Sequence, residues 1–105
     1  MSQHILIGQA TDEKIAEWKQ QYPQGIYAIE SDDHIAYFKN PNRNEMNCAM
    51  SKASQEKALD MYEELANLTF IGGSEDVIKN DQRFYGLAGQ LKTKFEGKKA
   101  TLVNL

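Results

Sequence analysis

The spacing of hydrophobic residues changes twice along the chain, from helical to alternating and back, and these changes predict an α+β fold. In the first segment Ile15, Trp18 and Tyr22 recur at steps of three and four residues, which is typical of one face of an α-helix. Thr11 is a suitable N-cap because its hydroxyl can accept a hydrogen bond from a free amide of the first turn. Pro23 then ends this helix of about three turns.

A β-hairpin is predicted at about residues 26–39. Two β-branched and aromatic runs, Ile26–Glu30 and His34–Lys39, flank the short polar connection Ser31-Asp32-Asp33. Alternation places Tyr27 with Ile29 on one face of the first strand, opposite Ile26 and Ala28, and Ile35 with Tyr37 on one face of the second, opposite Ala36 and Phe38. An isolated two-stranded ribbon is only marginally stable, so we expect helices to pack on one face, with Trp18 and Tyr22 as its cover.

Helical spacing returns after the hairpin and predicts roughly three more helices. Asn42 and Glu45 have the spacing of a box-like N-cap, and the helix that they open carries Met46, Ala49, Met50 and Ala53 on its apolar stripe. Ser54 is a further candidate cap, opening a helix through Ala58, Leu59, Tyr62, Leu65 and Ala66. We expect Phe70-Ile71-Gly72-Gly73 to close that helix and to lead into a turn.

The last predicted helix has the most regular period of the chain. It begins at Asn80 or Asp81, and its stripe consists of Phe84, Leu87, Ala88, Leu91 and Phe95. Gly86 and Gly89 should weaken it by about 1 kcal/mol each relative to alanine. They allow two interpretations, a close helix contact or a simple tolerance of glycine. We expect Trp18, Phe84, Leu87 and Leu91 to be among the most buried side chains.

The length of 105 residues predicts a single domain over residues 1–105, because half of such a chain could hardly form its own core. Residues 4–8, within the segment 1–10, are β-prone and predict an N-terminal arm or an edge strand. Residues 98–105 predict a C-terminal tail that frays or extends.

Composition and charge exclude several classes of function. No apolar run approaches the roughly 20 residues that cross a membrane, and the N-terminus lacks the pattern of a signal peptide. One cysteine excludes an internal disulfide and favours a cytoplasmic location. The net charge of -3 argues against a protein that mainly binds nucleic-acid phosphates.

The sequence predicts no catalytic, cofactor-binding or metal-binding residues. His4, His34 and Cys48 lie in separate elements without the paired spacing of metal ligands, so we expect exposed histidines. Cys48 has no base among its sequence neighbours, and we expect it to be a small buried residue rather than a nucleophile. Asp32 and Asp33 are interpreted as turn residues.

A mixture of aromatic and basic residues surrounds the end of the hairpin. It consists of Tyr37, Phe38, Lys39, Pro41, Arg43 and Lys52. Such mixtures can bind single-stranded nucleic acid, but Asp32, Asp33 and Glu45 are interleaved with this one. The pattern therefore favours a surface for protein contact or a solvated face, and a nucleic-acid-binding module is the weaker hypothesis.

Short segments of the chain resemble small tail-assembly-chaperone-like proteins of phages and prophages, especially those of Bacteroides-type bacteria. Residues 37–43 (YFKNPNR) are similar to an FRKP-R segment of these proteins, residues 70–75 (FIGGSE) to their aromatic-aliphatic-Gly-Gly-acidic segment, and residues 80–85 and 89–91 to their DD-LF and QL elements. The resemblance covers about residues 11–97. The chain departs from it at Asn40, where a basic residue is usual, and at Arg83, where an acidic one often stands.

The resemblance implies a non-enzymatic protein that binds the tape-measure protein, or another tail protein, during tail morphogenesis in the bacterial cytoplasm. Tyr37, Phe38, Pro41 and Arg43 are the candidate partner contacts, because they would place exposed aromatic and basic groups beside unpaired strand amides. Met46, Met50 and Met61 suit an adaptable apolar surface, although methionines also fill cores. The alternative hypothesis is a small intracellular adaptor that binds another protein and has no link to tails.

Overall fold

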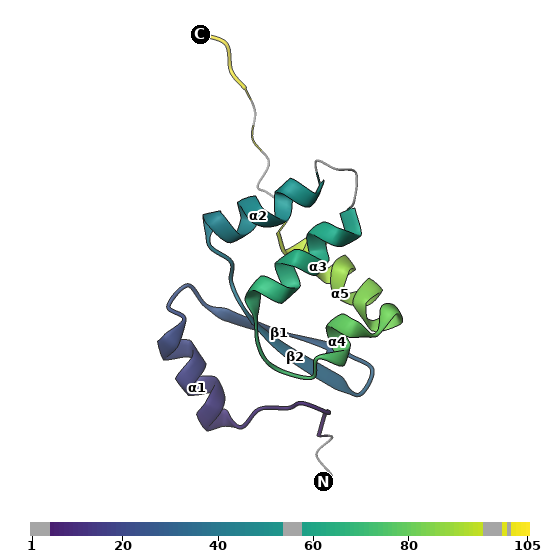
Figure 1. Cartoon of the computed structure of the whole chain (residues 1–105). Helices are drawn as coiled ribbons and strands as arrows, with labels where there is room; N and C mark the ends of the chain where they lie inside the picture. Colours follow the sequence, from purple (N-terminus) through teal and green to yellow (C-terminus); the bar gives the residue numbers. More distant parts are fainter. Residues whose placement is uncertain (1–4, 54–57, 96–99, 101) are drawn as a thin grey trace.

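The computed structural model describes residues 5–53, 58–95, 100 and 102–105. Its helices are α1 (Asp12–Gln21), α2 (Arg43–Ala53), α3 (Ala58–Thr69), α4 (Asp76–Lys79) and α5 (Asp81–Lys94), and its strands are β1 (Ile26–Ser31), β2 (His34–Lys39) and β3 (Phe70–Gly73). The predicted α+β fold, with a helix, a hairpin and then further helices, is confirmed (Figure 1). The candidate cap Ser54, the histidine His4 and part of the predicted tail (98, 99 and 101) lie outside the described residues.

The sheet has three antiparallel strands in the order β1-β2-β3. The predicted hairpin is confirmed, with Ser31 paired to His34 across the turn residues Asp32 and Asp33. Asp32 has a φ of 54°, a left-handed conformation that aspartate tolerates in tight turns. The N-terminal arm adds a single parallel bridge from Ile7 to His34, so the predicted edge strand is reduced to one pair.

Helices cover both faces of the sheet, whereas the sequence predicted a cover on one face only. On one face Trp18 of α1 packs with Ile35 and Tyr37, and Tyr22 borders this cluster. On the other face Phe38 packs in a larger cluster that holds the remaining helices. Its buried members are Ile29, Ala36, Phe38, Ala49, Leu65, Ala66, Val77, Phe84, Leu87 and Leu91.

The predicted core residues are confirmed as buried, but they belong to two cores. Leu87 and Leu91 are fully buried and Phe84 nearly so, in the cluster with Phe38. Trp18 lies on the opposite face of the sheet, with a ring centroid 5.1 Å from that of Tyr37. The alternation predicted for the hairpin is therefore correct, because Ile35 and Tyr37 face one cluster while Ala36 and Phe38 face the other.

The segment Phe70–Gly73 was expected to be a helix end and a turn, and that prediction is wrong. It forms β3 and pairs with β2 through Ala36–Gly73, Tyr37–Gly72 and Phe38–Phe70, with an irregularity between Tyr37 and Phe38. The short helix α4 follows, and it was not predicted. None of the described helices is both long enough and apolar enough to span a membrane.

Candidate functional site

Two of the predicted contact residues, Tyr37 and Phe38, are buried inside the protein. Phe38 has an exposed fraction of 0%, and its ring lies against those of Tyr27 and Phe70. Tyr37 packs on Trp18, and its hydroxyl accepts a hydrogen bond of 3.1 Å from the Ala10 amide. The expectation that both rings are exposed is wrong, because β2 is the central strand and helices cover both of its faces.

The sequence also predicted unpaired strand amides beside Phe38, and this prediction is wrong. Phe38 stands opposite Tyr27 of β1 and opposite Phe70 of β3, so β2 has partners on both sides at this position. Pro41 is half-buried and Arg43 is exposed, so these two remain available to a partner. The structure therefore does not bring the four predicted residues together on one surface.

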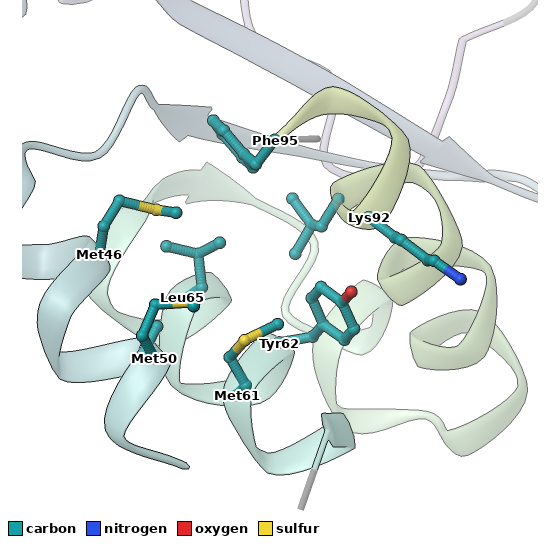
Figure 2. Close-up of a pocket in the computed structure, with 9 residues that line it drawn as sticks. Met46, Met50, Met61, Tyr62, Leu65, Lys92 and Phe95 are labelled. Carbon is teal, nitrogen blue, oxygen red and sulfur yellow. The ribbon is translucent and has the colours of Figure 1, made fainter. Parts of the chain in front are cut away.

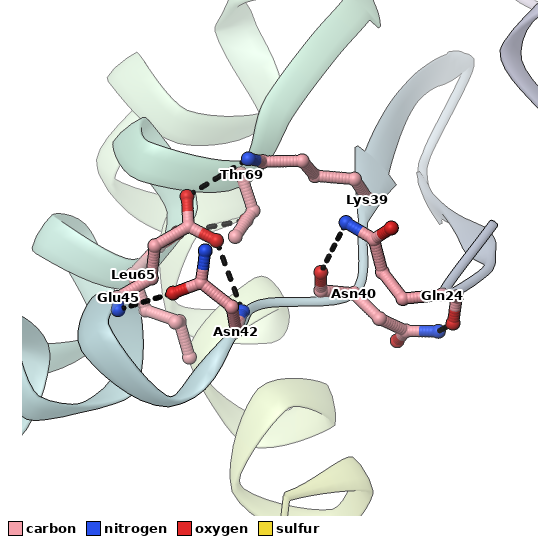
Figure 3. A network of polar contacts seen from close by, with 7 residues as sticks. All are labelled: Gln24, Lys39, Asn40, Asn42, Glu45, Leu65 and Thr69. Carbon is pink, nitrogen blue, oxygen red and sulfur yellow. Dashed lines mark hydrogen bonds and ion pairs between the residues drawn. The ribbon is translucent and has the colours of Figure 1, made fainter. Parts of the chain in front are cut away.

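A polar network fixes the chain where it leaves β2 and enters α2 (Figure 3). The Asn42 amide donates to the Glu45 carboxylate at 3.0 Å, and the Glu45 amide donates to the Asn42 side-chain oxygen at 2.8 Å. These reciprocal bonds confirm the predicted capping arrangement. The Glu45 carboxylate also pairs with the Lys39 ammonium at 2.9 Å.

Competing effects set the pKa of Glu45. Desolvation by burial raises the pKa of its carboxyl, but the Asn42 amide and the Lys39 ammonium stabilise the anion, and their sum leaves the pKa below its ordinary value. Glu45 is thus held as a carboxylate at neutral pH. In this network the basic Lys39 serves the fold rather than an open surface.

Asn40, where the resemblance leads one to expect a basic residue, joins β2 to the loop before β1. Its side-chain amide donates to the Gln24 carbonyl oxygen at 3.0 Å, and the Gln24 side chain donates to the Asn40 carbonyl oxygen at 3.4 Å. Its backbone amide donates to the Gly25 carbonyl oxygen at 2.9 Å. A lysine or arginine would lose the side-chain part of this contact because it lacks the short amide group.

The strongest candidate for a binding site is an apolar groove between α2, α3 and α5 (Figure 2). We call it the methionine groove, and it is lined by Met46, Ala49 and Met50 of α2, Met61, Tyr62 and Leu65 of α3, and Leu91, Lys92 and Phe95 at the end of α5. The three methionines reach this opening from two neighbouring helices, with Met46 and Met50 extending towards Leu65 and Met61 towards Tyr62. Residues that the sequence placed on separate predicted stripes are thereby gathered around one opening.

Helical spacing explains why these side chains meet. Met46 and Met50 are four residues apart on α2, and Met61 and Leu65 are four apart on α3, so each pair lies on one face of its helix. The floor is well packed, since Leu65 and Leu91 are almost fully buried, whereas Met50 at the opening is 53% exposed. The groove is thus a surface feature built on the main core.

The groove suits the binding of an apolar side chain. Its volume is about 70 Å³, roughly twice the volume of a water molecule in the liquid, so it can admit one aliphatic group. Tyr62 and Lys92 supply the polar side-chain groups of the lining. Methionines are flexible and polarisable, so the opening can adjust to side chains of different shape.

A second depression is larger and more polar. It has a volume of about 370 Å³ and is lined by Glu63, Asn67, Ile78, Lys79, Asp81 and Phe84. Charges of both signs line it, and the Lys79 ammonium is paired with the Glu75 carboxylate at 2.7 Å. The acidic Glu63 and Asp81 outnumber Lys79 in this lining, so the depression is weakly negative.

The residues weighed for metal or nucleophilic chemistry lie apart. His34 Nδ1 and Ser74 Oγ share a hydrogen bond of 2.7 Å, so this histidine is half-buried and bonded rather than exposed. Cys48 is exposed on α2, and the expectation that it is buried is wrong because it faces away from the stripe of Met46, Ala49 and Met50. Within the described part of the chain, no three His, Cys, Asp or Glu side chains gather as a metal site would require.

Comparison with known proteins adds no relative to this picture. No family model, curated protein or solved structure matches the chain.

Sequence reasoning singled out the three methionines but missed the groove that they line. The stripe on residues 46–50 was visible, and so was the stripe that ends at Phe95. The sequence did not show how α2, α3 and α5 cross. Their crossing depends on long-range packing, and it determines which stripes line the same groove.

Proposed function

We propose that this chain is a non-enzymatic, tail-assembly-chaperone-like protein that binds the apolar helical stripe of a tape-measure protein, with one aliphatic side chain of the stripe in the methionine groove. The long helices of such a partner carry apolar stripes that aggregate when they are uncovered. A groove of apolar side chains between helices is a common receptor for such a stripe. Binding would be stoichiometric and would take place in the cytoplasm of the bacterial host.

The observation that carries this proposal is the half-exposed Met50 at the mouth of an apolar groove whose floor is buried. An exposed large apolar side chain beside half-buried ones at one opening is typical of a surface that another molecule covers. The methionines favour a partner with a variable sequence, because they can repack around different side chains. The successive positions of a long apolar stripe present such different side chains.

The resemblance of the short segments supports the identity of the partner, and the two departures from it have local contacts. Asn40 bonds to Gln24, and the Arg83 guanidinium faces the Asp32 carboxylate with its Nε atom at 3.9 Å. Both departures are therefore compatible with a shared fold. Arg43 and Pro41 would lie outside the groove in this proposal and would contribute at most to its surroundings.

Co-expression with the tape-measure protein of the same tail gene cluster tests the proposal. We expect the wild-type chain to keep that protein in the soluble fraction and to elute with it on gel filtration. Met50→Glu, which places a charge at the mouth of the groove, should weaken the complex by about tenfold or more, since burying a charge without a partner is costly.

Asn47→Glu is the matched control, because Asn47 is exposed on the same helix and does not line the groove. It adds the same charge and should leave the complex unchanged. The proposal is wrong if the tape-measure protein is equally soluble without this chain and no complex elutes. A gene lying between a major tail gene and a very long helical gene would favour this proposal over the tail-independent adaptor.

A further inference from the structure

The strand β1 forms one outer edge of the sheet, and the hydrogen bonds of its neighbour β2 show which of its backbone groups are free. The Ile35 amide donates to the Ile7 carbonyl oxygen at 3.0 Å, and the Ile35 carbonyl oxygen accepts from the Ser74 amide at 2.8 Å. Both backbone groups of Ile35 therefore point away from β1. Ile35 and its partner Glu30 thus form a pair without hydrogen bonds between them.

The same holds for every second residue of β1, because bonded and non-bonded pairs alternate along an antiparallel ladder. Ala28 and Ile26 therefore share the orientation of Glu30. The bond of 2.9 Å from the Asn40 amide to the Gly25 carbonyl oxygen fits this alternation, because it places residue 25 in the bonded set. The N–H and C=O groups of residues 26, 28 and 30 thus face outwards, and outside the hairpin no described residue is hydrogen-bonded to them.

This edge is open and has few of the features that protect edge strands. Ala28 and Glu30 are exposed, and the cluster of Trp18 on that face of the sheet includes Ile26 but not Ala28. The strand β1 has a continuous register with β2 and contains neither proline nor lysine. The opposite edge strand β3, by contrast, has four residues, two of them glycines, and an irregular register. The sheet can therefore gain a strand at β1.

We infer that β1 of one copy pairs with β1 of a second copy, antiparallel and centred on Ala28, so that the two sheets join into one. In this register Ile26 lies opposite Glu30 of the second copy, and Ala28 lies opposite its own equivalent. All three outward-facing residues of each strand are then hydrogen-bonded. A centre at residue 27 or 29 would pair only two of them, so the register centred on Ala28 satisfies the most backbone groups.

The side chains of β1 favour a second copy as the added strand. Tyr27 and Ile29 face the large core, and the register centred on Ala28 places each Tyr27 opposite Ile29 of the second copy. An aromatic residue opposite a β-branched one is a favourable cross-strand pair, and the two-fold symmetry supplies it twice. The two Glu30 carboxylates stay apart because each lies opposite Ile26. Such an interface is self-complementary and closes as a dimer.

The inference is independent of the proposed function, because no residue of β1 lines the methionine groove. Light scattering on the whole chain over a range of concentrations tests it, and we expect the mass to rise from that of one chain towards that of two. Ala28→Pro removes one outward-facing N–H from each strand, which an edge strand tolerates, and should raise the dissociation constant about tenfold or more. Ala28→Thr is the matched control, because it keeps the N–H and suits a strand, and it should change the dissociation constant far less.

Charged variants at position 28 test both the occupant and the register. Ala28→Lys and Ala28→Glu each place like charges opposite each other across the two-fold axis, so each alone should dimerise about fivefold more weakly than the wild type. An equimolar mixture should recover the association, because the mixed dimer places a lysine opposite a glutamate. Circular dichroism and thermal melts of each variant verify that the fold is retained.

The inference is overturned if the wild-type chain keeps the mass of one chain up to millimolar concentration. It is also overturned if Ala28→Pro dimerises as well as the wild type, because the contact then lies elsewhere, or if the mixture of charged variants associates no better than each variant alone. Protection of the β1 amides from hydrogen exchange only when a tail protein is added would likewise overturn it, and would assign the edge to an extended segment of that partner. Failure of tape-measure binding with an intact dimer would instead reject only the proposed function.

Discussion

Tyr27 has a buried hydroxyl, and its ring contacts both an aromatic side chain and a lysine ammonium. Its ring stacks on Phe38 with centroids 5.5 Å apart, and the Lys94 ammonium lies 4.6 Å from its ring centroid. The hydroxyl has no hydrogen-bond partner of proper geometry among the described residues. Thr69 lies close enough to lower the pKa of Tyr27 slightly, but its own proton is donated to the Leu65 carbonyl oxygen at 2.7 Å.

We expect Tyr27→Phe to leave the protein as stable as the wild type or more stable by up to about 1 kcal/mol. A buried donor without a partner carries a desolvation cost, and the change removes that donor while keeping the ring. Urea unfolding measures the difference. A loss above 1 kcal/mol would mean that the hydroxyl has a partner and that its burial is satisfied.

Burial raises the pKa of Tyr27 to about 12 from an ordinary 10.0, despite the opposing effect of Thr69. Because the folded state holds this proton more tightly than the unfolded state does, its contribution to stability is present below pH 10 and is lost as the pH rises towards 12. Glu45 behaves in the opposite sense. The pKa of its carboxyl is lowered in the folded state, so its contribution is present at neutral pH and is lost as the pH falls below the ordinary carboxyl range.

The acidic side of this pH dependence can be measured with Glu45→Ala. At pH 7 the variant should lose about 0.5–2 kcal/mol, the usual magnitude of a helix cap, because it removes both the cap and the Lys39 partner. At pH 3 the difference from the wild type should shrink, since the wild-type carboxyl is then partly protonated. Urea melts at both pH values give the comparison, and an equal loss at both would contradict the role of the charge.

At the scale of elements, β3 shows what local sequence signals could not provide. A four-residue strand with two glycines has low β-propensity, and the same glycines are a common signal for the end of a helix. The strand exists because β2 offers a free edge and because Gly72 lies under the Trp18 ring. A Cβ atom at Gly72 would stand 2.6 Å from Trp18 Cζ2.

Gly72→Ala should therefore destabilise the protein by about 1–3 kcal/mol, as is usual for overpacking, and should change the near-ultraviolet signal of Trp18. Gly86→Ala is the matched control, because nothing lies within 4 Å of the added methyl group on α5. It should stabilise the protein by about 0.5–1 kcal/mol through helix propensity. A stable Gly72→Ala variant with an unchanged tryptophan signal would show that the ring can move aside.

The elements with strong local signals were predictable from the sequence, whereas the site was not. The caps at Thr11, Asn42 and Asn80 and the hairpin turn are local, and each forms the hydrogen bonds or the pairing that its residues favour. The exposure of Gly86 and Gly89 likewise favours simple tolerance over a close helix contact among the described residues. The side chains that cover each face of an element come from distant parts of the chain. For this reason the sequence wrongly predicted that Phe38 is exposed, and it did not reveal the groove.

At the scale of the whole molecule, the sheet separates two cores and β2 contributes to both. Phe38 belongs to the large core, while Arg43, only five residues later, is exposed at the start of α2. Both residues were among the four predicted partner contacts. The structure assigns them different roles, and a comparison of single substitutions can separate these roles.

Phe38→Ala should lower the free energy of unfolding by about 3–5 kcal/mol, because it empties a fully buried site between Tyr27 and Phe70. Arg43→Ala should change it by less than about 0.5 kcal/mol, as is usual for an exposed residue. Chemical denaturation of the two variants gives both values. A small loss for Phe38→Ala would contradict its place in the core.

The position of β2 also determines how the molecule opens. Residues Ala36 to Phe38 are buried and pair with β1 on one side and with β3 on the other. Both neighbouring strands contribute side chains to the two cores, so freeing the amides of β2 requires the detachment of a strand that both cores hold. We therefore expect the paired amides of β2 to exchange with deuterium only through global unfolding, while the amides of α1 exchange through smaller openings. In native-state hydrogen exchange the two groups should converge only near the denaturant midpoint, and α1 would be the first part of the fold to detach.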